Sequence, residues 1–198
     1  RGGTLWCGTR DGVYRLGAEG TMAYLQNLYG VPLRGVRNIR GAHDGSMWLA
    51  TDLGAVQATD GKATLYTTQE GLSHNTVFCL ETDAKGRTWM RTSNGLTCFA
   101  HGRSKRVDLG EDFGSNYVSL LIKDRNEFLW AGTNNGLFQF NPDSLLAHSS
   151  ATRHITEEDG LRGLECNLNA GFMDRSGRLF FGTNARLVLH DPSRPSLR

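Results

Sequence analysis

The sequence predicts an all-β fold, a β-propeller built of four-stranded antiparallel blades. A box of strand-forming residues around an aromatic anchor recurs five times, with a period of about forty residues. Glycine flanks most of these boxes at fixed positions. A period of this length made of short strands indicates stacked sheets, because one such sheet cannot bury its own apolar face. The five anchors are Trp6, Trp48, Trp89, Trp130 and Phe180.

Each recurring position of the box has a structural reason, and the second copy illustrates all of them. Gly45, three residues before the anchor, follows Asp44 in a pair that favours a hairpin turn. Thr51, three residues after the anchor, is β-branched and suits the end of a strand. Gly54, six residues after the anchor, opens the next strand. The sequence departs from the pattern at Arg91, Glu127 and Arg186.

The strands fill about four and a half blades. The first copy, up to residue 35, lacks an innermost strand, and the next three begin at Val36, Val77 and Val118. The last copy has an inner strand near Leu168 but no outermost strand. Because propeller rings close with about four to eight whole blades, we expect residues 1–192 to belong to a larger ring of the seven-bladed type. Residues 143–151 are an insertion, and residues 193–198 are a predicted linker.

Composition excludes several classes of function. A net charge of +2 on 22 basic and 20 acidic residues gives no reason to expect a nucleic-acid partner. No apolar run reaches the roughly 18 residues of a membrane span, so we expect membrane attachment only through other segments. Arg1 lies inside a repeat, and the natural start is expected to precede it. The open blades at both ends predict self-association, for example as a homodimer.

No pattern for a metal or cofactor site is present, and none is predicted. The histidines lack metal-ligand spacing. Cys7, Cys79, Cys98 and Cys166 form no CxxC pair, so buried free thiols are favoured over disulfides or metal ligands. The basic segment 101–106 is interpreted as a solvated hairpin tip rather than a phosphate site, because acidic residues follow at once.

An enzyme is the main alternative that the fold class allows. Propeller glycosidases carry an aspartate box, which segment 82–89 approaches, but Ala84 occupies the position of the acid. Asp83, Asp124 and Asp174 recur singly, six residues before three successive anchors, which indicates a role in a turn rather than a catalytic pair. The nucleophile motif Gly-x-Ser-x-Gly is also missing. No catalytic residue is therefore predicted.

The repeat resembles a known family, the regulator-propeller repeat of two-component sensor proteins. The pattern Gly-x-Leu-Trp-x-Gly-Thr-x-x-Gly-Leu carries the likeness, and segments 134–137 and 70–75 match it closely. The last copy, with Gly160, Glu165 and a phenylalanine-rich box, is similar to the last blade of that propeller. The resemblance implies an extracytoplasmic, periplasmic sensor domain ahead of an immunoglobulin-like domain, a membrane helix and a histidine kinase or other output module.

The resemblance also implies a non-catalytic domain that senses an oligosaccharide or another small ligand. A scaffold for protein partners shares the same fold and remains an alternative. Ligand contacts are expected in the links between the outer strand of one blade and the inner strand of the next, because propellers place function there. These links contain the candidate residues His74, Asn75, Asn116, Tyr117, Arg162 and Glu165. Asn75 and Asn116 have a second interpretation as turn caps.

Overall fold

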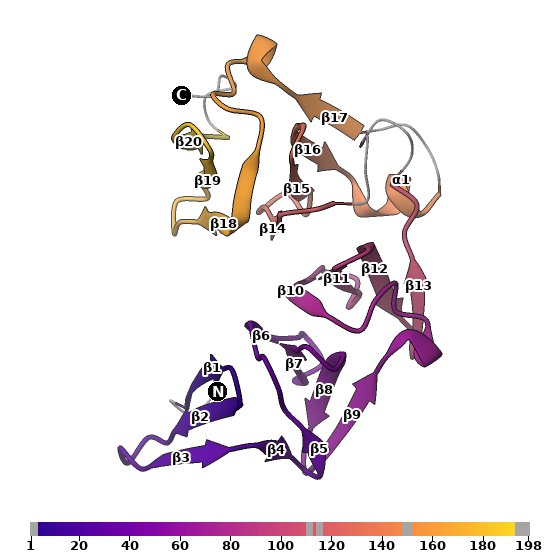
Figure 1. The fold of residues 1–198 in the computed structure, drawn as a ribbon, viewed down its shortest axis with the longest axis vertical. Helices are drawn as coiled ribbons and strands as arrows, with labels where there is room; N and C mark the ends of the chain where they lie inside the picture. Colours follow the sequence, from indigo (N-terminus) through magenta and orange to yellow (C-terminus); the bar gives the residue numbers. More distant parts are fainter. Residues whose placement is uncertain (1–3, 110–112, 114–116, 148–151, 193–198) are drawn as a thin grey trace. The chain divides into compact units, whose positions relative to one another are not determined.

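The structure is a computed structural model that describes residues 4–109, 113, 117–147 and 152–192. These residues form antiparallel β-sheets with very little helix. They divide into two compact units, the first of Arg1–Ser93 with Thr97–Arg106 and the second of Asn94–Leu96 with Val107–Arg198. Figure 1 labels the strands of both units. The predicted linker, residues 193–198, lies outside the described residues.

Three sheets of the predicted kind belong to the first unit, except for Gly95 and Leu96 of the third sheet, which belong to the second unit. The first sheet has the order β1 (Leu5–Thr9), β2 (Gly12–Leu16), β3 (Met22–Leu25). The second has the order β6 (Asn38–Gly41), β7 (Met47–Ala50), β8 (Ala55–Thr59), β9 (Lys62–Tyr66). The third has the order β10 (Val77–Thr82), β11 (Thr88–Thr92), β12 (Gly95–Ala100), β13 (Arg103–Arg106).

Two further sheets belong to the second unit. The fourth sheet has the order β14 (Leu120–Lys123), β15 (Leu129–Thr133), β16 (Gly136–Phe140), β17 (Thr152–Ile155). The fifth has the order β18 (Cys166–Met173), β19 (Leu179–Thr183), β20 (Leu187–His190). Within the described residues the five sheets therefore hold three, four, four, four and three strands, as the sequence predicts.

Some elements were not predicted from the sequence. A two-stranded hairpin, β4 (Asn27–Leu28) with β5 (Val31–Pro32), interrupts the first link. The insertion begins as a short helix, α1 (Pro142–Leu146), because the Asn141 side chain accepts hydrogen bonds from two backbone N–H groups of the first turn. Two links start with 3-10 turns, η1 (Thr68–Glu70) and η3 (Glu157–Asp159). Residues 148–151 of the insertion lie outside the described residues.

The recurring threonine closes the turn that follows the anchor strand in the first, second, fourth and last copies. The hydroxyl of Thr51 donates to the carbonyl oxygen of Gly54 at 2.7 Å, and that of Thr133 donates to Gly136 at 3.1 Å. In the last copy Thr183 makes the same bond to Arg186 at 3.0 Å, so the turn forms without the glycine. The structure thus gives the threonine a second role beyond its preference for strands.

The glycine at the end of this turn lies directly against the outer strand of its own sheet. A Cβ atom on Gly54 would lie 2.1 Å from the carbonyl oxygen of Tyr66, and one on Gly136 would lie 2.5 Å from that of Ile155. Both glycines also have positive φ angles, +150° and +104°. Only glycine fits both requirements without moving the neighbouring backbone.

The aspartate that recurs six residues before the anchor organises the preceding turn, as expected. One carboxylate oxygen of Asp124 accepts hydrogen bonds from the backbone N–H groups of Asn126 and Phe128 at 2.9 and 3.0 Å. The other accepts from the indole N–H of Trp130 at 2.8 Å. In the third sheet Asp83 binds the indole of Trp89 in the same way at 2.9 Å. A single carboxylate therefore fixes both the turn and the anchor ring.

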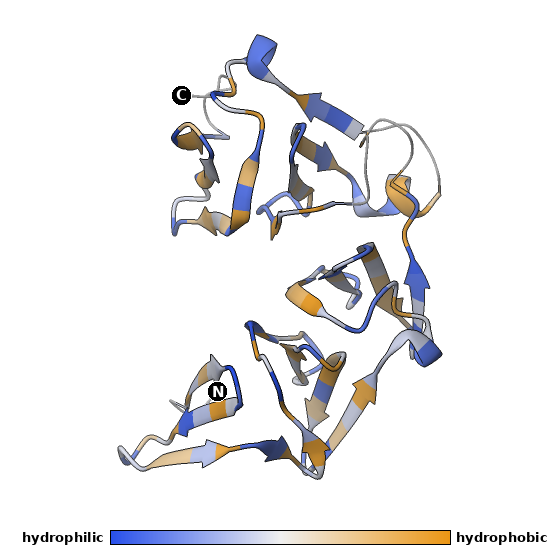
Figure 2. Cartoon of the chain, in the orientation of Figure 1, coloured by the Kyte–Doolittle hydropathy of each residue, from blue (hydrophilic) through white to orange (hydrophobic). Residues whose placement is uncertain are grey.

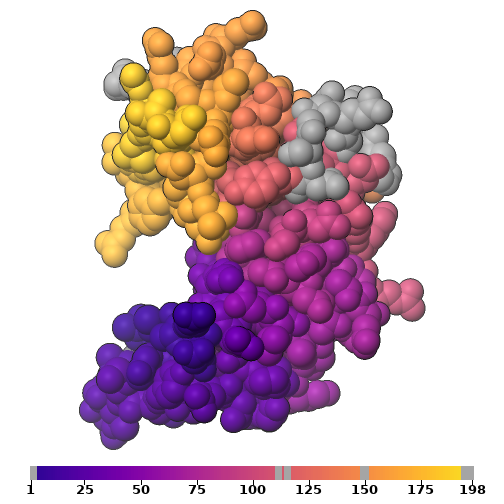
Figure 3. Space-filling view, in the orientation of Figure 1, coloured from indigo at the N-terminus to yellow at the C-terminus, as the bar shows by residue number. Residues whose placement is uncertain are grey.

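The anchor rings fill the space between neighbouring sheets of a unit, as the repeat predicts. In the first unit Trp48 of β7 packs against Phe99 of β12, with ring centroids 4.9 Å apart. In the second unit Trp130 of β15 packs against Phe181 of β19 at 5.5 Å and against His190 at 4.8 Å. Side chains fill the space between the ribbons of each unit (Figure 3). Trp48, Trp89 and Trp130 are at most 1% exposed.

The last sheet corrects two assignments made from the sequence. Leu168 has the inner-strand position that Val36, Val77 and Val118 have in the other copies. Those valines are buried, but Leu168 is exposed and Cys166 is buried instead. A bulge between Cys166 and Gly171 shifts the register of β18 against β19 and causes this change. Phe180 occupies the anchor position but is only half-buried, whereas Phe181 is fully buried against Trp130.

The cysteines agree with the sequence prediction at three positions of four. All four are free thiols, and Cys79, Cys98 and Cys166 are buried. Burial raises the pKa of the Cys98 and Cys166 thiols to about 11, so both stay protonated at neutral pH. Cys7 was expected to be buried but is exposed. The cause is its place on β1, which is an edge strand of the three-stranded first sheet.

The strands contain both hydrophilic and hydrophobic residues (Figure 2). The basic strand β13 is hydrophilic and mostly exposed, which confirms the interpretation of segment 101–106 as a solvated hairpin tip. Large apolar side chains are exposed on the first and last sheets. These side chains are Leu5, Tyr14, Met22, Tyr24, Leu168, Phe172 and Leu187. Self-association through these sheets remains a prediction. Among the described residues, no helix has the length and apolar character needed to cross a bilayer.

Candidate functional site

The links between sheets run beside the turns that follow the anchor strands. In the second unit the Gly136 N–H donates to the carbonyl oxygen of Leu164 at 2.9 Å, and the Asn184 N–H donates to that of Glu165 at 2.9 Å. In the first unit the Ser93 N–H donates to the carbonyl oxygen of Thr76 at 3.1 Å. Links and turns therefore share one face within each unit, as expected for the predicted ligand-binding loops.

The polar groups of the first link mostly hold the link itself in place. The side chain of Asn75 accepts a hydrogen bond from the Thr68 N–H at 2.8 Å, so it caps η1 as its second interpretation proposed. Thr67 and Glu70 complete this turn with a reciprocal capping box. His74 accepts from the Thr76 N–H through Nδ1 at 2.9 Å, and its side chain is exposed. Of the two candidates, His74 is thus the more available for a ligand.

The second unit contains three of the other candidates. Arg162 and Glu165 are exposed in the link before β18, and only their backbone carbonyls hold the link to neighbouring turns. Tyr117, before β14, has 49% of its surface exposed. Asn116 lies outside the described residues. The structure thus groups His74 with Asn75 in the first unit, and Tyr117, Arg162 and Glu165 belong to the second.

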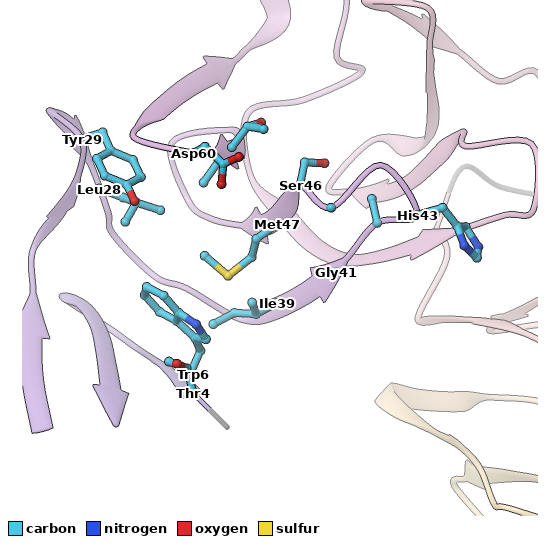
Figure 4. Close-up of a pocket in the computed structure, with 14 residues that line it drawn as sticks. Thr4, Trp6, Leu28, Tyr29, Ile39, Gly41, His43, Ser46, Met47 and Asp60 are labelled. Atoms are coloured by element: carbon cyan, nitrogen blue, oxygen red, sulfur yellow. The ribbon is translucent and has the colours of Figure 1, made fainter. Parts of the chain in front are cut away.

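The first unit also contains a pocket that sequence analysis missed. It has a volume of about 480 Å³ and lies between the first and second sheets. Its apolar wall comes from β1, from the β4–β5 hairpin and from strands β6 and β7 (Figure 4). The turn between β8 and β9 contributes polar residues. The lining side chains used below are Trp6, Leu28, Tyr29, Ile39, Met47 and Asp60.

This pocket and the links are at opposite ends of the strands. The β6–β7 turn, which lines the pocket, precedes Met47 at the start of β7, whereas the link contacts follow the end of the anchor strand at Thr51. The Val77 N–H, at the end of the next link, donates to the Thr51 carbonyl oxygen at 2.9 Å. The first unit therefore offers two separate places for a ligand.

Hydrogen bonds make the pocket wall rigid near Ser46. This residue is buried, and its hydroxyl donates to the Asp44 carboxylate at 2.7 Å. The Gln57 amide donates to the same hydroxyl at 3.3 Å. The hydrogen bond from the Ser46 side chain is the main cause that lowers the pKa of Asp44 below its ordinary value. In contrast, no hydrogen bond or ion pair with a described residue engages the carboxylate of Asp60.

Only part of this pocket could be predicted from the sequence. Trp6 occupies the anchor position and was interpreted as a core ring, but it is half-buried on an edge strand. Tyr29 belongs to a hairpin that the repeat pattern does not contain. The positive φ of Tyr29 could not be read from its residue type, because tyrosine rarely adopts it.

Among the described residues, no group of three or more His, Cys, Asp or Glu side chains is arranged to hold a metal ion.

Burial is the main cause that lowers the pKa of His190, and the charge of Arg153 lowers it further. The imidazole of His190 packs on Trp130, and its neutral form is favoured by this environment.

Comparison with solved structures decides the fold. The chain is similar to the extracellular domain of a hybrid two component system (BT3049) from B. thetaiotaomicron, with a TM-score of 0.77 and 21% identity over 96% of this chain. It is likewise similar to the extracellular domain of BT4673 from the same organism, with a TM-score of 0.74 and 22% identity over 98% of this chain. It is also similar to the WD40 beta propeller domain of Doa1, with a TM-score of 0.66 and 13% identity over 99% of this chain. The fold is that of a β-propeller.

The β-propeller fold is shared with enzymes as well. Virginiamycin B lyase from Staphylococcus aureus matches 100% of this chain with a TM-score of 0.74 and 13% identity. The chain spans 26% and 25% of the two extracellular domains and 66% of the lyase. Comparison of the sequence with protein-family models and with curated proteins finds no match. At these identities the comparisons establish the propeller and leave its function to be argued from the site.

Proposed function

We propose that this propeller segment is a non-catalytic ligand-binding part of an extracytoplasmic sensor in a two-component signalling protein. The repeat pattern carries the proposal, because an aromatic anchor followed three residues later by threonine recurs in all five copies and resembles the regulator-propeller repeat, with departures only at Arg91, Glu127 and Arg186. The structural similarity to extracellular domains of two hybrid two component systems supports it. We propose an oligosaccharide or another small molecule as the ligand, a periplasmic or other extracytoplasmic location, and an output such as a histidine kinase in another part of the protein.

The link residues of the second unit suit the recognition of such a ligand. Tyr117 offers an exposed aromatic face, on which the apolar side of a sugar ring can stack. Arg162 donates hydrogen bonds and Glu165 accepts them, so together they match the donors and acceptors of hydroxyl groups. A ligand that prefers one arrangement of the protein would shift its population toward that arrangement.

A lyase-type enzyme is the alternative that the comparisons favour specifically, because a streptogramin B lyase and virginiamycin B lyase share the fold. A sensor releases its ligand unchanged, whereas a lyase converts it. Mass spectrometry of a bound ligand after prolonged incubation separates the two. A product that accumulates with time would replace the sensor proposal by an enzymatic one.

We expect thermal-shift measurements with an oligosaccharide panel to identify a stabilising ligand. Replacing Tyr117 and Arg162 together by alanine should weaken its binding about tenfold, the equivalent of roughly 1.4 kcal/mol. The free energy of unfolding should change by less than about 1 kcal/mol, because both side chains are at the surface. Arg103→Ala, at an exposed hairpin, is the matched control and should bind normally. Equal affinity of the double variant and the unaltered chain would remove this assignment.

A further inference from the structure

We propose that the pocket between the first and second sheets binds one ring of a neutral, hydroxylated ligand, such as a terminal sugar unit. The inference rests on the proposed sensing function and adds to it a second site, at the opposite ends of the strands from the links. A volume of about 480 Å³ is in the range of small-molecule sites, and the mixture of apolar walls with a few polar groups is typical of them.

Trp6 gives the pocket an accessible aromatic surface. Trp6 is half-buried because it lies on β1, an edge strand of the first sheet, whereas the other three tryptophans lie on strands with a neighbour on both sides and are at most 1% exposed. Trp6 packs with Ile39 and Met47 at the boundary of the first and second sheets, and all three line the pocket (Figure 4). The C–H face of a sugar ring is apolar and packs well on such a surface.

Tyr29 adds a second ring, held in an unusual backbone conformation. Its φ angle is +49°, and Gly30 follows with +86°, so the pair forms the tight turn between β4 and β5. Asparagine, aspartate or glycine normally occupies the first of these positions. The strained turn exposes 57% of the Tyr29 surface at the pocket. Strain that persists around an exposed aromatic side chain indicates a role in binding.

Asp60 supplies acceptors for hydroxyl groups. Its carboxylate is exposed in the turn between β8 and β9, and no described residue is hydrogen-bonded or ion-paired to it. Two neighbouring sugar hydroxyls can donate to the two oxygens of one carboxylate. The hydroxyls of Thr4 and Thr59 also line the pocket and can donate or accept.

The charges around the pocket favour a neutral ligand. The negative charge of Asp60 opposes an anion in the same space. The Arg15 guanidinium lies 6.0 Å from the centroid of the Trp6 ring and already provides a cation there, so a second cation on this ring would be repelled. An uncharged ligand with several hydroxyl groups is repelled neither by Asp60 nor by Arg15.

The test uses Trp6 as its own reporter in the 198-residue chain, because the other three tryptophans are buried. Glucose, galactose, maltotriose and cellotriose are titrated while tryptophan fluorescence and its quenching by acrylamide are recorded. We expect at least one of these probes to reduce quenching at least twofold. Trp6→Phe should abolish this change, and Asp60→Asn should weaken binding about tenfold. Asp11→Asn, an exposed aspartate that does not line the pocket, is the matched control and should bind normally.

Two results would overturn the inference, and they differ in what they imply for sensing. A probe that raises the melting temperature but leaves quenching and the Asp60→Asn affinity unchanged binds elsewhere. If the Tyr117 and Arg162 double variant then loses that binding, the sensing function stands and only the pocket assignment fails. If none of the four probes changes fluorescence or melting temperature at about 10 mM, roughly ten times a dissociation constant of 1 mM, the sugar class itself is wrong for both sites.

Discussion

Trp130→Ala is expected to lower the free energy of unfolding by about 3–5 kcal/mol, the range for removing a large aromatic side chain from a core. The Trp130 ring is fully buried and contacts Phe181 and His190 of the next sheet. Loss of the ring leaves a cavity between two sheets. It also removes the indole N–H that donates a hydrogen bond to the Asp124 carboxylate. Urea-induced unfolding followed by circular dichroism measures the effect.

Trp6→Ala is the matched control, because Trp6 has the same repeat position but is only half-buried. We expect a loss of about 1–2 kcal/mol there, since less apolar area returns to water. Equal losses in the two variants would contradict the view that the anchor rings are held between neighbouring sheets.

Asp124→Ala is expected to cost about 2–4 kcal/mol, because it removes the acceptor of a buried indole N–H and of two backbone N–H groups. The carboxylate is buried, so water replaces these bonds poorly. Asp124→Asn should cost less, since its remaining oxygen can still accept from the turn. Thermal and urea unfolding report both variants.

Asp174→Ala provides the internal comparison for this prediction. Asp174 has the same place before the last anchor and the same turn bonds to Ser176 and Arg178. The anchor that follows Asp174 is Phe180, whose side chain has no N–H group to donate. The Asp174 carboxylate instead binds the exposed side chain of Arg178 at 2.7 Å. We expect a clearly smaller loss than for Asp124→Ala, because water can replace the hydrogen bonds of this more exposed carboxylate. A cost as large as that of Asp124→Ala would show that the indole bond contributes little.

The repeat made the sheet architecture predictable from the sequence. The anchor tryptophan, the threonine and the turn glycine are each required by the strand or turn in which they lie. The same requirement recurs about every forty residues. A pattern that repeats in this way averages out the ambiguity of any single strand. The role of Asp124 in its turn was inferred in the same way, although its bond to Trp130 depends on how the ring lies in the folded sheet.

Features that occur once were not predictable in this way. A bulge in the last sheet buries Cys166 and leaves Leu168 exposed. The residue types do not indicate which of the two is buried, because both are apolar. The β4–β5 hairpin puts Tyr29 in a turn position that sequence rules assign to other residues.

The candidate site shows the same limit. Exposure of Arg162, Glu165 and Tyr117 follows from their place in polar links, which the sequence shows. The use of Asn75 as a cap and the grouping of the candidates in two units depend on three-dimensional contacts. The pocket beside Trp6 depends on a hairpin and two turns that are distant in sequence.

Acrylamide quenching of the Trp6→Phe variant tests the central claim, that anchor indoles lie sealed between neighbouring sheets. The remaining fluorescence comes from Trp48, Trp89 and Trp130, all at most 1% exposed. The account predicts emission at short wavelength and a quenching constant at least about five times lower than in urea, because the quencher cannot enter a close-packed interior. Quenching in the folded variant as strong as in the urea-unfolded chain would contradict it.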